Sequence, residues 1–388
     1  IRYIAMPVLV ILPVLLLILG KHKARKVAGL LSMTVVLLLN GCSARELEDK
    51  GFPMAIGLDK DEENIVLTFD FPDLSDSEKG ESPSQRPLSF SVEGGAYYES
   101  QKAYENNTNK VLDYSHLKAI VISQEFLADN EELRELLAWL EQEEVLARNT
   151  CLFVAQDRAS NILALTGQTS GTMGKYLEQM VDTQEDFKAN KVVTIGDLMN
   201  QWHNQNELLL IPVLTNNGGV PSITKYAAMD AFVYKGTVSV EESMKSFLCQ
   251  GLLSRFLYQL QGGTVFQLTN LKPEIKILGN SQAGDSQVGD SQITVQVALT
   301  GEARMQKAGR DEAQTKGMQK KQLDQQLEET LAVAADQMKD APGIDITNSF
   351  ILLGGYARGL YDRYQQDPEG YEKSLNYRFL VDMDIVNE

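Results

Sequence analysis

Two apolar runs separated by a basic cluster open the chain and constrain where the rest of it can fold. Residues 3–19 are uncharged and apolar over about the length that spans a membrane. The basic cluster at 21–26 follows, and a shorter apolar run at 27–39 ends in Leu39-Asn40-Gly41-Cys42. A basic segment, an apolar segment and a small residue at the cleavage site are the order of a secretory signal peptide. A cysteine directly after that site is typical of bacterial lipoproteins.

Cys42 is therefore the predicted lipidation site. Its thiol would carry a diacylglyceryl group, and cleavage would make Cys42 the new amino terminus. Two acyl chains anchor a protein far more firmly than one, at about 0.8 kcal/mol for each buried methylene. An ordinary transmembrane helix with an incidental cysteine is the alternative, but the abrupt polar stretch at 43–50 favours the signal peptide.

The first 20 residues need a separate explanation, because they precede a complete signal peptide at 21–41. The chain does not begin with Met. We expect either that the start was assigned too far upstream or that 1–20 is a genuine fusion, which would place the basic cluster on the cytoplasmic side of the membrane.

Composition narrows the class of partner. The chain has 53 Asp and Glu against 36 Lys and Arg, a formal charge of −17. Such an acidic protein is a poor match for nucleic acid, because binding there depends on neutralising phosphates. It also repels anionic lipid headgroups, so membrane attachment has to be covalent or hydrophobic. Three Cys and three His leave little material for a disulfide framework or a histidine-built metal site, and we expect no cofactor.

After Cys42 the pattern alternates between strands and helices. Residues 52–58 and 65–71 predict a hairpin across the turn at 59–64. Further strands are predicted at 88–92, 116–123 and 151–155, with helices at 97–112 and 130–147. Strand, helix and strand in succession indicate an α/β domain over 42–188.

Two more domains complete the predicted organisation. A middle domain, 189–263, is predicted to have strands at 208–214 and 227–234 and a helix at 240–260. A C-terminal α/β domain, 264–388, is predicted to have strands at 274–278, 293–299 and 377–385 and a helix at 312–339. The loop 279–292 repeats Gly-Asp-Ser-Gln, which favours a tolerated insertion over a binding site. The predicted fold class is thus α/β of the mixed α+β kind, with mixed sheets flanked by helices.

A search of the sequence for chemistry is mostly negative. No glycine-rich phosphate loop, nucleophile elbow, HExxH motif or paired Cys-x-x-Cys is present. His116 falls in a predicted buried strand, where a hydrogen-bonded core histidine is favoured over a catalytic base. His203 lies in a polar segment and is expected at the surface.

The paired carboxylates and the remaining cysteines also have explanations other than catalysis. Glu143-Glu144 and the pair Asp382/Asp384 could serve glycoside hydrolysis, but adjacent acids are usually solvated faces. Cys151 and Cys249 could form a disulfide after export, or stay as buried free thiols. We therefore predict no catalytic residue and no metal site.

A family resemblance lies in the order of several sequence pieces. Arg45-Glu46-Leu47-Glu48-Asp49, leading into Ala55-Ile56-Gly57-Leu58-Asp59, resembles the start of the spore germination lipoproteins that form the C subunit of nutrient germinant receptors. Further matching pieces lie at 115–123, 148–164, 228–235, 238–252, 345–359 and 377–386. The sequence departs from the family at the Gly-Asp-Ser-Gln insertion and at 351–355.

The resemblance implies a three-domain, non-enzymatic lipoprotein on the outer face of the spore inner membrane, in complex with the integral-membrane A and B subunits. It also offers an origin for 1–26, which look like the last helix and basic tail of the permease-like B subunit. A substrate-binding lipoprotein of a transporter is the alternative function, and a cell-wall hydrolase using the acids above is a third.

Overall fold

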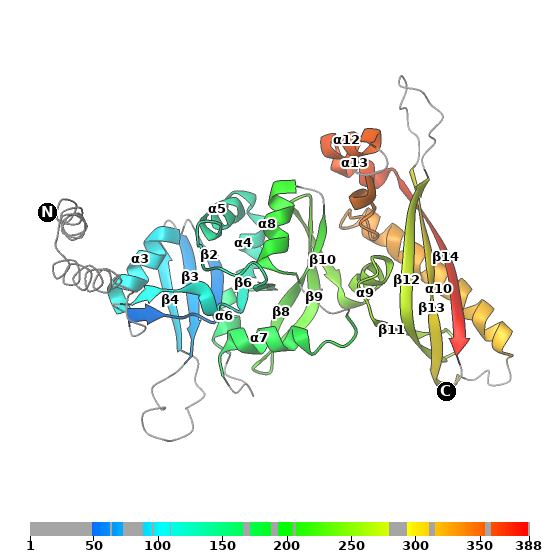
Figure 1. Ribbon diagram of the computed structural model, residues 1–388, viewed down its shortest axis with the longest axis horizontal. Coiled ribbons are helices and arrows are strands. Elements are labelled where there is room, and N and C mark those ends of the chain that lie inside the picture. Colours follow the sequence, from blue (N-terminus) through cyan, green and yellow to red (C-terminus); the bar gives the residue numbers. More distant parts are fainter. Residues whose placement is uncertain are drawn as a thin grey trace, which may run out of the picture. The chain divides into compact units, whose positions relative to one another are not determined.

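The computed structural model describes residues 49–62, 64–72, 88–94, 97–108, 110–165, 171–187, 193–204, 207–278, 293–309, 315–353 and 358–386. Residues 51–388 form one compact unit, which contains two large β-sheets flanked by helices (Figure 1). The expected mixed α+β class is confirmed. Cys42, the signal peptide and the loop 279–292 lie outside the described residues. Within the described ranges, no helix is long and apolar enough to cross a membrane.

The larger sheet has eight strands in the order β10-β9-β8-β7-β6-β2-β3-β4. Their bounds are β2 (Ala55–Asp61), β3 (Asn64–Phe71), β4 (Leu88–Gly94), β6 (Ala119–Ser123), β7 (Cys151–Ala155), β8 (Leu208–Asn217), β9 (Val220–Asp230) and β10 (Val233–Ser239). The four central strands β8, β7, β6 and β2 are parallel, and antiparallel hairpins extend the sheet on both sides. The predicted hairpin of β2 and β3 is confirmed.

Helices cover both faces of this sheet (Figure 1). The helices in this part of the chain are α3 (Tyr97–Thr108), η3 (Tyr114–His116), α4 (Gln124–Ala128), α5 (Asn130–Leu140), α6 (Ala159–Leu163), α7 (Met173–Asp182) and α8 (Ile195–Asn204). Because side chains alternate along a strand, Ile120 and Ile122 of β6 pack with α4, α5 and α8, whereas Ala119 and Val121 pack with α6 and α7. Both faces of the central strands are therefore buried, as their unbroken apolar runs indicate.

Two buried aspartates tie helices to the sheet. The carboxylate of Asp59 in β2 accepts hydrogen bonds from the backbone N–H groups of Ala159 (2.6 Å) and Ser160 (3.0 Å) at the start of α6. Asp70 of β3 accepts one from Gly174 N at 2.8 Å, at the start of α7. A helix N-terminus presents unsatisfied N–H groups and partial positive charge, which a carboxylate complements. At Gly174 an added Cβ would lie 2.1 Å from the carbonyl oxygen of Met54, so only glycine allows this docking.

The smaller sheet contains β11 (Arg255–Gln259), β12 (Val265–Leu278), β13 (Ile293–Lys307) and β14 (Leu375–Val386), in that order. The parallel strands β13 and β14 are connected through α10 (Lys316–Asp340), whose predicted leucine stripe is buried. On α10, Glu328 and Asp324 accept hydrogen bonds from the backbone N–H groups of Val381 (2.8 Å) and Met383 (3.0 Å) in β14. These bonds cover the open edge of β14, which would otherwise offer a template for strand pairing.

The remaining elements are short. The structure contains α9 (Val240–Cys249), η4 (Ser349–Leu352), α12 (Arg358–Gln366) and α13 (Pro368–Lys373), and the two-residue strands β1 (Lys50–Gly51) and β5 (Val111–Leu112) lie outside both large sheets. The helices expected at 97–112 and 130–147 end early, at Thr108 and Leu140.

Two predicted elements are wrong in a way that local backbone geometry explains. The helix expected over 240–260 stops at Cys249, and the chain then passes Gly251 (φ 72°) and forms β11. The strand expected over 227–234 is divided between β9 and β10, because Ala231 (φ 47°) and Phe232 (φ 63°) make a tight turn with positive φ. Glycine or asparagine normally marks such a turn, and neither is present here.

The strands of the first two predicted domains share the eight-stranded sheet, and β11, at the end of the second, pairs with β12 of the third. The domain boundaries at 188/189 and 263/264 stay a prediction.

Candidate functional site

The two histidines that drew attention in the sequence lie at the surface. His116 is exposed in the 3-10 turn η3 and not buried in a strand, so that expectation is wrong. The Asp113 side chain accepts a hydrogen bond from Ser115 N and caps this turn, and β6 begins only at Ala119. The His116 ring meets Phe52 edge to face, with 5.1 Å between centroids. His203, at the end of α8, is exposed as expected.

The His203 ring nitrogen Nε2 lies 2.7 Å from Oε1 of Glu141, a contact that becomes an ion pair when the ring is protonated. The predicted carboxylate pairs are largely solvated. Glu144 is exposed in the turn after α5, and Asp382 and Asp384 point outwards from β14. The sequence interpretation of these acids as solvated surface is confirmed for these three, while partial burial raises the pKa of Glu143.

Cys151 in β7 and Cys249 at the end of α9 are both buried free thiols. Burial, with a smaller contribution from nearby carboxylates, raises the pKa of Cys151 to about 11 and that of Cys249 further. A thiol is nucleophilic as the thiolate, so neither cysteine is poised for nucleophilic chemistry. Of the two alternatives that the sequence leaves open, the structure has the unpaired thiols.

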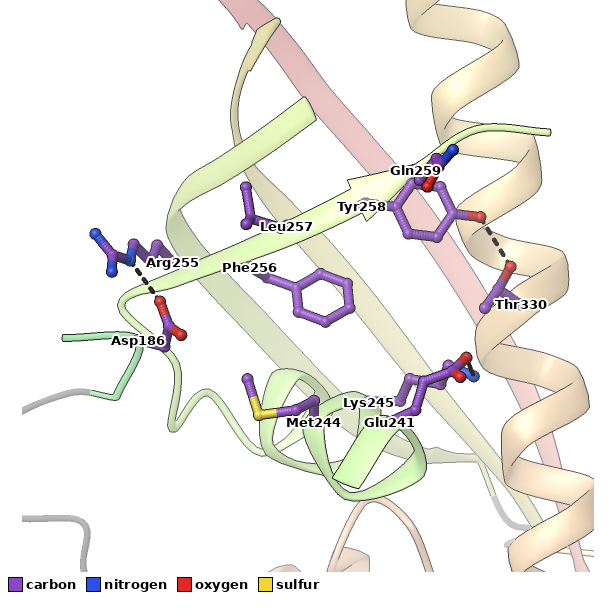
Figure 2. Close-up of a pocket in the computed structure, with 10 residues that line it drawn as sticks. All are labelled: Asp186, Glu241, Met244, Lys245, Arg255, Phe256, Leu257, Tyr258, Gln259 and Thr330. Carbon is purple, nitrogen blue, oxygen red and sulfur yellow. Dashed lines mark hydrogen bonds and ion pairs between the residues drawn. The ribbon is translucent and has the colours of Figure 1, made fainter. Parts of the chain in front are cut away.

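A pocket of about 450 Å³ lies between β11, α9 and α10 (Figure 2). Phe256 projects from β11 into the space above α9, which contributes Met244. The charged groups at its border are engaged with one another: Lys245 pairs with Glu241 at 2.9 Å, and Arg255 pairs with Asp186. The hydroxyl of Tyr258 shares a 2.8 Å hydrogen bond with Thr330 of α10. The pocket thus offers apolar surface and paired charges, which suits contact with another molecule better than bond-breaking chemistry.

The most unusual electrostatic feature is a buried acidic cluster that the sequence did not reveal. It consists of Asp345, Asp230 of β9 and Glu372 of α13, each at most 2% exposed. Asp345 is fully satisfied by donors from Thr347, Ser349 and Tyr377.

The other two acids of the cluster lie against each other. A protonated Glu372 donates a hydrogen bond to the Asp230 carboxylate, and the nearest cation is farther away, with Nζ of Lys235 3.8 Å from Oε2 of Glu372. Burial raises the pKa of Glu372 to about 10, and the neighbouring Asp230 adds to the shift. Burial also raises the pKa of Asp230, whose Oδ1 accepts a 3.4 Å hydrogen bond from Tyr364. At neutral pH the cluster therefore holds a proton on Glu372.

The cluster joins segments that are remote in the sequence. Its only local signal is the spacing Asp345-x-Thr347-x-Ser349, which is typical of a turn closed by an aspartate side chain. Within the same turn, the side chain of Asn348 accepts a hydrogen bond from Leu208 N at 3.0 Å, across 140 residues of chain. This hydrogen bond and the cluster attach the C-terminal segment to the large sheet. Within the described ranges, no group of three His, Cys, Asp or Glu side chains could hold a metal ion.

Comparison with known proteins shows which domain the first part of the mature chain contains. Residues 43–216 match the model of the spore germination protein N-terminal domain. This part of the chain is a spore germination protein N-terminal domain. The resemblance seen in the sequence is thereby confirmed, and the matched region begins directly after Cys42. The likeness of 1–26 to a permease tail lies outside the match and stays a prediction.

The fold extends the likeness beyond the family match. The chain is similar to the crystal structure of the GerBC protein, with a TM-score of 0.52 over 86% of this chain and 97% of that chain. Sequence identity is 14%, so this likeness concerns the fold. Among curated proteins, none matches the chain.

Proposed function

We propose that this chain is a spore germination protein, the C subunit of a nutrient germinant receptor, held at the outer face of the spore inner membrane by a diacylglyceryl group on Cys42. One observation carries the proposal. The spore germination domain starts at Ser43, the residue that follows Leu39-Asn40-Gly41-Cys42. Cleavage before Cys42 would leave the whole family domain directly attached to the anchored residue. The transporter alternative is not favoured, because the matched family is one of spore germination.

The subunit acts by assembly with the integral-membrane A and B subunits and not by catalysis. Its family is a non-catalytic kind of protein. The charges that border the pocket of Figure 2 are paired with one another, and the two cysteines lie buried. A tether confines the chain to the surface where membrane partners lie, which raises their effective concentration without any new contact.

The lipid anchor is tested at Cys42. In cells given a fatty-acid probe, Cys42→Ala should lose labelling of this protein completely, because Cys42 supplies the thiol that is acylated at the predicted cleavage site. The neighbouring variant Ser43→Ala should keep full labelling. Nutrient-triggered germination should be weak or absent in the Cys42→Ala spores. Labelling that survives in Cys42→Ala would refute the lipoprotein assignment.

Assembly is tested by isolating the native protein from spore membranes. Gentle detergent extraction and affinity capture of the wild-type chain should recover the A and B subunits in amounts comparable to the chain itself, as quantified by mass spectrometry. Loss of the anchor should reduce this recovery. If the lipidated, folded protein is recovered without any integral-membrane subunit, the receptor role is wrong even though the anchor is right.

A further inference from the structure

The large sheet is split between β7 and β8. These neighbours pair only through Val154 with Val213 and Ala155 with Leu214. Before that point, β7 turns to a different segment: Leu152 N donates to Val193 O at 2.9 Å, and Ile195 N donates to Thr150 O at 2.9 Å. The first half of β8 therefore has β9 on one side and, among the described residues, no strand on the other.

The direction of the backbone groups shows which of them face this gap. Leu208 N bonds the side chain of Asn348, and Leu214 O accepts from Gln156 N on the β7 side. Both of these residues are at even-numbered positions. Pro212 is also at an even-numbered position and has no N–H to donate, yet the pairing of β8 with β9 continues past it. The backbone groups of even-numbered residues in β8 therefore point away from β9. Alternation along the strand therefore points the N–H and C=O of Leu210 into the gap. Among the backbone hydrogen bonds outside the strand ladders, none between described residues involves Leu210.

A pocket of about 680 Å³ occupies the gap, hereafter the β7–β8 fissure. Part of its wall is apolar and is formed by Phe187, Leu210, Tyr226 and Phe247, among other residues. Consecutive residues of β8 line the pocket, and since their side chains alternate between faces, the fissure must follow the edge of the strand.

The described rim of the fissure is rich in carboxylates. Five carboxylates line it, and among the described lining residues there is no Lys or Arg; the acids are Glu178, Asp182, Glu185, Asp197 and Glu207. Outside cations compensate two of them: Lys118 lies 2.9 Å from Glu178, and Arg255 lies 3.0 Å from Glu185. Cys151 also lines the fissure, and the charges of Glu178 and Asp182 add to burial in raising the pKa of its thiol. Among the described lining residues, acidic side chains thus outnumber basic ones.

We propose that the β7–β8 fissure binds a short extended segment of a partner protein that carries lysine or arginine, and that this segment pairs with the open edge of β8. An open strand edge recognises an extended backbone, and adjacent pockets select alternate side chains. The apolar wall takes the side chains that point inwards, and the rim carboxylates attract basic ones. The edge of β14 differs from that of β8, because side chains of α10 already bond to its backbone N–H groups. The proposal is independent of the lipid anchor and of the receptor assignment.

The test uses the full chain in detergent and a rhodamine-labelled peptide, acetyl-Lys-Val-Lys-Val-Lys-amide, with fluorescence anisotropy as the readout. We expect saturable binding of this probe. A peptide with Glu in place of each Lys should not bind, because the rim repels it. A probe that is N-methylated at its interior amides keeps its charge but cannot pair with a strand, and it should bind at least tenfold more weakly.

Matched variants locate the binding. The double variant Glu178→Gln/Asp182→Asn removes two rim charges and should weaken binding about tenfold. Glu144→Gln/Asp336→Asn removes two exposed charges away from the fissure and should leave binding unchanged. Bound peptide should also slow alkylation of Cys151, which is 8% exposed, relative to Cys249 at 1%, as followed by mass spectrometry of the cysteine-bearing fragments.

Three results would overturn the proposal: no saturable binding of the lysine peptide, equal weakening in both double variants, or binding that leaves Cys151 as reactive as before. The first would mean that the fissure does not accept an extended segment. The second would mean that the probe senses only the overall charge of the protein. The third would place the peptide elsewhere on the surface.

Discussion

Replacing Asp345 by alanine should lower the free energy of unfolding by about 4 kcal/mol, which is at the upper end for a single substitution. The buried carboxylate of Asp345 accepts hydrogen bonds from the N–H and hydroxyl of Thr347 (2.9 and 2.7 Å), the N–H and hydroxyl of Ser349 (both 2.6 Å) and the hydroxyl of Tyr377 (3.0 Å). Alanine would leave these donors buried without an acceptor, and each such group costs about 1–3 kcal/mol unless it finds a new partner.

Urea unfolding of the full chain in detergent, followed by circular dichroism, measures the effect. Asp345→Asn keeps the shape and one acceptor oxygen, so its loss should be smaller than that of Asp345→Ala. Asp336→Ala removes an exposed carboxylate of α10 and should stay within about 0.5 kcal/mol of the wild type. A loss below about 1 kcal/mol in Asp345→Ala would mean that the donors rearrange easily and that the cluster does not hold the C-terminal segment in place.

Periodicity in the sequence predicted most of the elements that bury one continuous face. The stripe of Leu323, Leu327 and Leu331 predicted α10, and the apolar run at 151–155 predicted β7. In both cases the residues that pack together are neighbours at helix or strand spacing, so the pattern is visible in one short window.

What the sequence could not predict depends on partners that are distant in the chain. Residues 255–259 have helical spacing with the residues before them, but pairing with β12 makes them a strand. Asp230 and Glu372 carry no local signal because 142 positions separate them, and the β7–β8 fissure arises only because 193–194 takes the place that β8 would otherwise fill. Tertiary contacts decide such features, and local propensity is too weak to reveal them.

The same acidic cluster should make stability fall as pH rises. Burial raises the pKa of Glu372 from 4.5 to about 10, so the folded protein keeps a proton that the unfolded chain releases above its ordinary pKa. Because the folded pKa is the higher one, this contribution is fully present below the unfolded pKa and is lost as pH rises towards the folded value. Asp230, Lys235, Tyr364 and Asp345 are the charged and titratable groups that act on Glu372 and on its neighbour Asp230.

The best window to measure this dependence is pH 7.5 to 8.5. Burial raises the pKa of Asp70 to about 7, so Asp70 contributes a similar slope mainly below this window. One retained proton changes the free energy of unfolding by about 1.4 kcal/mol for each pH unit, so the wild type should lose about that much across the window. Glu372→Gln stays neutral and should remove the slope, whereas Glu369→Gln, on the exposed side of α13, should keep it. The same slope in Glu372→Gln as in the wild type would contradict this prediction and would mean that Glu372 is ionised in the folded protein. An ionised Glu372 beside Asp230 would need a cation closer than Lys235, whose Nζ lies 3.8 Å from Oε2 of Glu372.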